Sequence, residues 1–135
     1  MEIQIKLIGA SLIFLALIHI IFPKYFNWQK ELVNISLVNR QMIYVHTFFI
    51  ALALLLMGLL CITSARDLMA TKLGSKLALG LGVFWITRLL IQFFGYSSKL
   101  WKGKAFETII HILFSILWTY ISAIFFYIYW LGKDL

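Results

Sequence analysis

The sequence has few of the residues that cross-link, connect or solubilise ordinary domains. Its one cysteine, Cys61, excludes an intramolecular disulfide, and no CxxC motif occurs. One proline and eight glycines in 135 residues leave no low-complexity linker. Charged residues make up 13% of the chain, about half their share in a soluble domain. HExxH, GxSxG and P-loop motifs are also absent, so no local motif identifies a chemistry.

Apolar residues are abundant instead. They form 63% of the chain, and the mean hydropathy is +0.96, whereas a soluble domain is about 45 to 50% apolar. We therefore predict an integral membrane protein. A net charge of +7 would favour nucleic acid in a soluble chain, but here the basic residues lie between apolar runs, where they meet lipid headgroups. We expect membrane lipids as partners and no nucleic acid.

Four apolar stretches are long enough to cross a hydrocarbon core of about 30 Å, which needs about 20 helical residues. Short connections between them predict an all-α antiparallel up-down four-helix bundle, with residues 1–135 as one transmembrane domain. The first stretch has no small-residue cleavage site and is expected to stay as a helix that Pro23 closes. The predicted spans run near Ile5 to Phe22, Gln41 to Thr63, Leu77 to Tyr96 and Phe106 to Leu131.

The first connection, residues 23–40, is the longest. Within it Trp28, Leu32, Ile35 and Val38 recur at helical spacing, which favours a short interfacial helix along the membrane surface over an irregular loop. Basic residues divide five against six between the two sides of the bundle, so the positive-inside rule leaves the orientation open.

All three histidines lie about one helical turn inside the same predicted end of the bundle. His19 precedes Pro23, His46 follows the polar start of the second span, and His111 follows Glu107 at the start of the fourth. Ionisable side chains at such a depth are costly, so their first interpretation is a functional site. A single histidine in a bundle is more often a satisfied polar residue, but three at one depth favour a site.

Neutral imidazoles on separate helices are a standard way to hold iron, copper or zinc. We predict a transition-metal site with His46 and His111 as the preferred ligands and His19 and Glu107 in support. Glu107 precedes His111 by four residues, so its carboxylate is placed to join the metal shell or to orient the imidazole. Taken alone, Glu107 is better explained by the helix dipole.

The third span adds Arg88 and Gln92 at the same end, and we predict that both bind a cofactor. If the cofactor is haem b, His46 and His111 are its axial ligands, and Arg88 or the neighbouring lysines pair with the propionates. Without a metal, the cluster suits a quinone headgroup, a lipid headgroup or a proton pathway. Arg88 snorkelling to the membrane surface is an equal alternative to a role in the site.

These residues favour a redox-associated membrane protein, and the rival is a non-enzymatic subunit of a larger membrane complex or a homo-oligomer. Whether the protein is an enzyme is left open. Several short strings along the chain carry a resemblance to a known family: Asn39-Arg40-Gln41, Tyr44-Val45-His46, Trp85 with Arg88, Phe93-Phe94-Gly95-Tyr96, Leu100-Trp101-Lys102-Gly103, Thr108 with His111, and Leu117-Trp118 with Tyr120. In these strings the sequence resembles a family of small bacterial four-helix membrane proteins of unknown activity. That resemblance implies a location in the bacterial inner membrane and no chemistry.

Overall fold

The computed structural model describes residues 1–135 and is helical throughout, without strands. Four helices are long and apolar enough to cross a membrane, which agrees with an integral membrane protein. They are α1 (Glu2–Tyr25), α3 (Leu37–Thr63), α5 (Lys72–Phe94) and α6 (Ala105–Gly132). The shorter helices are α2 (Trp28–Glu31), α4 (Ala65–Ala70) and the 3-10 turn η1 (Ser98–Leu100).

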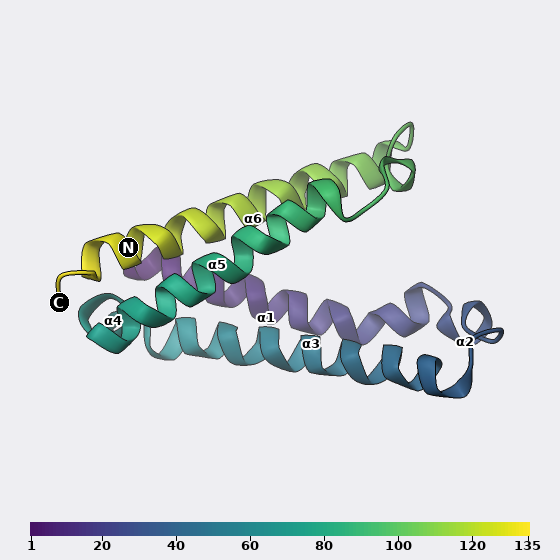
Figure 1. The fold of residues 1–135 in the computed structure, drawn as a ribbon, viewed down its shortest axis with the longest axis horizontal. Coiled ribbons are helices and arrows are strands. Elements are labelled where there is room, and N and C mark those ends of the chain that lie inside the picture. The colour runs from purple at the N-terminus through teal and green to yellow at the C-terminus, as the bar shows by residue number, and fades with distance from the viewer. The chain divides into compact units, whose positions relative to one another are not determined.

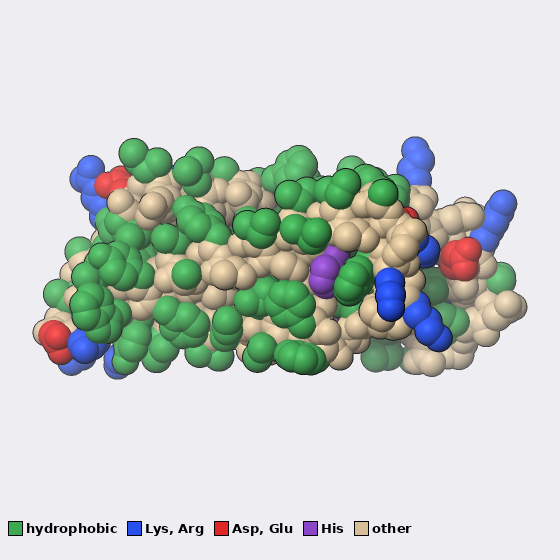
Figure 2. Space-filling model, turned by 90° about the horizontal axis from the view of Figure 1, so that it is seen from above, with side chains coloured by type: hydrophobic (Ala, Val, Ile, Leu, Met, Phe, Trp, Pro, Cys, Tyr) green, Lys and Arg blue, Asp and Glu red, His purple; other side chains and the backbone are tan.

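The surface has the distribution that a membrane requires. On the face drawn in Figure 2, Lys, Arg, Asp and Glu side chains lie toward the ends of the helices, and hydrophobic side chains cover the stretch between them. Large apolar side chains such as Phe14, Phe48 and Ile116 are more than half exposed. Lipid can cover such side chains, so their exposure needs no further explanation in a spanning helix.

The chain divides into two compact units, residues 1–65 and 66–135, each built on one pair of long helices. In the first unit α1 packs against α3 (Figure 1). Gly9 and Gly58 make the closest approach, because a Cβ on Gly9 would lie 2.7 Å from the Gly58 carbonyl oxygen. Small residues that let two backbones touch are the usual means of holding membrane helices together.

In the second unit α5 packs against α6 and runs antiparallel to it. The start of α5 meets the end of α6, where the Ser75 hydroxyl donates to the Tyr129 carbonyl at 3.4 Å. Midway, the indole rings of Trp85 and Trp118 stack with their centroids 4.8 Å apart. The end of α5 therefore lies beside the start of α6, and this is where the polar residues of the hairpin meet.

The predicted spans were correct in number, but several ends were wrong. Pro23 does not close α1, which continues to Tyr25; proline only removes the hydrogen bond to the His19 carbonyl, and a helix end tolerates that loss. The second and third long helices also begin earlier than predicted, at Leu37 and Lys72, where the side chains of Ser36 and Thr71 accept capping bonds.

The first connection is less regular than the spacing of its apolar residues predicts. It contains the four-residue helix α2 followed by turns, and α3 begins at Leu37. The helix of this connection therefore ends at Glu31 and does not continue through Ile35, and its position at the membrane surface stays a prediction. The up-down four-helix bundle, and the single domain that it implies, stay predictions, because only the two helix pairs are defined.

Candidate functional site

A chain of hydrogen bonds joins α5 to α6 near one end of the second hairpin. The Arg88 guanidinium donates from Nη1 to Gln92 Oε1 at 3.3 Å. The amide nitrogen Nε2 of Gln92 lies 3.0 Å from Nδ1 of His111. Gln92 is buried, whereas Arg88 and His111 are half-buried. This Arg88–Gln92–His111 relay brings together three of the six predicted site residues.

The relay also fixes which nitrogen of His111 carries the proton. A guanidinium can only donate, so the Gln92 carbonyl oxygen must face Arg88 and the Gln92 amide N–H must face the imidazole. The nitrogen Nδ1 of His111 then accepts, and a neutral ring must carry its proton on Nε2. No protein group bonds to Nε2, so this N–H has no partner within the chain.

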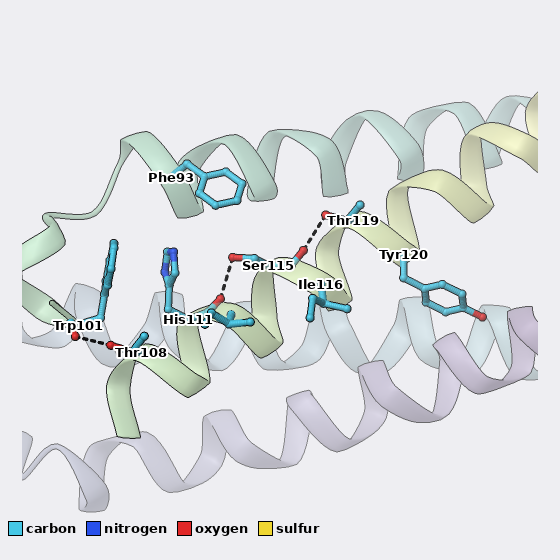
Figure 3. Close-up of a pocket in the computed structure, with 9 residues that line it drawn as sticks. Phe93, Trp101, Thr108, His111, Ser115, Ile116, Thr119 and Tyr120 are labelled. Atoms are coloured by element: carbon cyan, nitrogen blue, oxygen red, sulfur yellow. Dashed lines mark hydrogen bonds between the residues drawn. The ribbon is translucent and has the colours of Figure 1, made fainter. Parts of the chain in front are cut away.

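Two aromatic side chains hold the His111 ring in place (Figure 3). The indole of Trp101 stacks on it at 4.6 Å with an interplanar angle of 16°, and Phe93 meets it edge-on at 5.9 Å. Trp101 lies in the connection before α6, and its carbonyl accepts a 2.6 Å hydrogen bond from the Thr108 hydroxyl. The first turn of α6 thus anchors the tryptophan that orients His111.

Arg88 has aromatic neighbours but no counter-ion. Its guanidinium carbon lies 5.6 Å from the Tyr96 ring centroid and 5.4 Å from that of Trp118. No carboxylate comes within ion-pair distance of it, and Glu107 is exposed. The predicted contact between Glu107 and His111 is likewise not formed; Gln92 and Trp101 are the partners of the imidazole.

Two further donors lie buried in this hairpin. Trp85 is 2% exposed and Trp118 5% exposed, and the indole Nε1 of each has no hydrogen-bond partner. Buried indole N–H groups are normally paired, so leaving two unpaired has a cost. Like the Nε2–H of His111, these two indole N–H groups are donors without a partner in the chain.

A groove of about 610 Å³ follows one face of α6 and passes His111 to reach Thr108 and Trp101 (Figure 3). Aliphatic and aromatic side chains form most of its walls, and the ring of Tyr120 lies at its far end. The hydroxyls of Ser115 and Thr119 donate to carbonyls of their own helix, at 2.7 Å each. The lining residues are Phe93, Trp101, Thr108, His111, Ile112, Ser115, Ile116, Thr119 and Tyr120.

The other two histidines belong to the first hairpin. His19 is half-buried, donates from Nδ1 to the Leu15 carbonyl at 2.7 Å and packs against the Phe22 ring. His46 is exposed and makes no hydrogen bond. In neither hairpin do three or more His, Cys, Asp or Glu side chains gather as metal ligands.

The sequence interpretation missed the role of Trp101 and Thr108, which it named only among the residues that carry the resemblance. A signal was present, because a threonine in the first turn of a helix and three residues before a histidine can bond back to the preceding loop. Spacing alone does not show that the loop would fold a tryptophan onto the imidazole.

No protein-family model, curated protein or solved structure matches this chain. The resemblance to small bacterial membrane proteins therefore stays a prediction, and the geometry of the second hairpin carries the functional argument.

Proposed function

We propose that the protein binds a membrane amphiphile in the α6 groove, with the headgroup at His111 and the apolar tail along the helix. The observation that carries this proposal is the relay, which makes the polar end of an otherwise apolar groove a hydrogen-bond donor. A carbonyl, ester or phosphate oxygen is the partner that such a donor needs. Quinones and lipids both carry these oxygens on apolar tails.

The position of the groove supports this proposal. His111 lies six residues after the start of α6, which places it about 9 Å along the helix axis from that end. In a spanning helix this depth lies near the boundary between headgroups and acyl chains. Ile112 and Ile116 are at least half exposed on the same face, so a tail beside them covers apolar surface.

Native mass spectrometry of the detergent-purified full chain tests this proposal. The probe is an equimolar mixture of palmitoyl-oleoyl phosphatidylglycerol and phosphatidylcholine. We expect wild type to retain one lipid, His111→Ala to lose it, and His46→Ala, a matched change of an exposed histidine, to keep it. A wild-type protein that retains no lipid, or a His111→Ala variant that retains as much as wild type, would contradict the proposal.

The predicted metal or haem site gives a different pattern in the same variants. In the relay neither nitrogen of His111 offers a free lone pair to a metal, because Gln92 donates to Nδ1 and the tautomer inferred above carries its proton on Nε2. The metal prediction requires the relay to open and His46 to share the metal. Elemental analysis and an optical spectrum would then show a metal or a Soret band that His46→Ala removes. If the protein binds neither lipid nor metal, the alternative of an accessory subunit of a larger membrane complex is favoured. The bacterial inner membrane stays the proposed location in either case.

A further inference from the structure

We infer that the headgroup bound at the His111 end of the groove is anionic, and specifically that it is the phosphate of an anionic membrane lipid. This inference rests on the proposed function, because it identifies the chemical class of the amphiphile. The evidence is the charge around the Arg88–Gln92–His111 relay and in the connection between α5 and α6.

The first observation is the uncompensated charge of Arg88. Its guanidinium has five N–H groups, of which one bonds to Gln92, and its other neighbours are the aromatic rings of Tyr96 and Trp118. Aromatic faces offset a cation weakly compared with a carboxylate or phosphate. A charge without a counter-ion at this depth is costly, and an anionic ligand would reduce that cost.

The second observation is the connection between α5 and α6, which forms the polar end of the groove. Trp101 lines the groove, and Lys99, Lys102 and Lys104 surround it in sequence and are exposed. Residues 95–107 hold these three lysines and one carboxylate, that of the exposed Glu107. A tryptophan among lysines at a helix end is typical of a segment that meets anionic lipid headgroups.

The third observation is that the polar group at this end of the groove, the His111 Nε2–H, is a donor without a partner in the chain. The indoles of Trp85 and Trp118 also lack partners, but they are buried and do not line the groove. A neutral quinone has two carbonyl acceptors and no charge, so it would satisfy a donor but leave Arg88 uncompensated. A lipid phosphate would accept the His111 N–H and would bring a negative charge to the end of the relay that starts at Arg88. Arg88 itself does not line the groove, so its charge acts on the phosphate across Gln92.

The lipid mixture described above tests the charge separately from binding. We expect wild type to retain phosphatidylglycerol over phosphatidylcholine by about tenfold, the order of effect that one partly screened charge produces. Arg88→Gln should lower this ratio several-fold, and so should joint replacement of Lys99, Lys102 and Lys104 by Gln. Arg88→Lys keeps the charge and should keep most of the preference.

The control is Lys72→Gln combined with Lys76→Gln, at the opposite end of α5, which should leave the ratio unchanged. Equal retention of the two lipids by wild type would overturn the charge inference and leave the proposed function standing. A control variant that lowers the ratio as much as Arg88→Gln, or decylubiquinone displacing phosphatidylglycerol at equal concentration, would overturn it in the same way. Absence of any retained lipid would overturn both proposals.

Discussion

Gln92→Glu tests the relay with a change of one side-chain group. An amide at this position accepts from Arg88 and donates to His111. A carboxylate in the same place can only accept, so the imidazole must turn its Nδ1 from acceptor to donor. We therefore expect the proton of His111 to move from Nε2 to Nδ1 in the variant, with the shape of the side chain almost unchanged.

The expected size of this effect follows from the bonds involved. A hydrogen bond to a charged group contributes about 1.5 to 3 kcal/mol, so the Nε2–H form of His111 should fall below about 10% in the variant. Stability is a poorer readout. The new attraction between Arg88 and the introduced carboxylate is about 5 kcal/mol at 3.3 Å and an effective dielectric constant of about 20. Removing the carboxylate from water costs several kcal/mol, so this cost offsets much of the attraction.

Nitrogen NMR of histidine-labelled protein in detergent distinguishes the two tautomers, because protonated and unprotonated ring nitrogens resonate far apart. His19→Phe and His46→Phe variants assign the His111 signals. Gln41→Glu, at an exposed glutamine of α3, is the matched control and should leave those signals unchanged. An Nδ1–H form in the wild type, or identical His111 signals in wild type and Gln92→Glu, would refute the relay.

Two further predictions concern the scaffold and the anchor of the site. Gly74→Ala should destabilise the second hairpin by about 2 to 3 kcal/mol, because the added Cβ would overlap the Asp67 carbonyl. Gly80→Ala lies in the same helix, and its added Cβ meets no atom within 4 Å. This second variant should stabilise the hairpin by about 0.5 to 1 kcal/mol. A detergent thermal melt measures both, and equal shifts would refute this assignment. Thr108→Val should remove the hydrogen bond to the Trp101 carbonyl and increase hydrogen exchange in residues 97–104. Ser115→Ala is the control, because the Ser115 hydroxyl bonds only within its own helix, and it should leave that exchange unchanged. Equal exchange in the two variants would contradict the role of Thr108 in anchoring Trp101.

The sequence predicted the four long helices because their signal is strong. About 20 consecutive apolar residues satisfy one physical requirement, and the requirement does not depend on neighbouring helices. The ends of the helices depend on weaker effects. Polar residues such as Glu2 and Lys72 extend a helix past its apolar part, and capping by Thr71 decides where α5 starts.

The sequence could predict only those contacts of the site that follow from α5 and α6 running antiparallel. Arg88 and Gln92 lie near the end of α5 and His111 near the start of α6, so a short connection must place them at one depth. The sequence could not show that Gln92 rather than Glu107 bonds the imidazole, because that choice depends on how the two helices are rotated about their axes. The loop conformation that places Trp101 over the ring is equally invisible in the spacing.

The amide at residue 92 is also the reason why we propose an acceptor ligand rather than a metal at this site. A carboxylate there would neutralise Arg88 and hold Nδ1–H, which leaves Nε2 as a lone pair of the kind that metals bind. The amide does the opposite on both sides: it leaves the charge of Arg88 uncompensated, and it leaves His111 with a proton to donate. Both effects favour a ligand that accepts hydrogen bonds and carries negative charge. The same residue thus connects the packing of α5 on α6 to the class of molecule that the groove would bind.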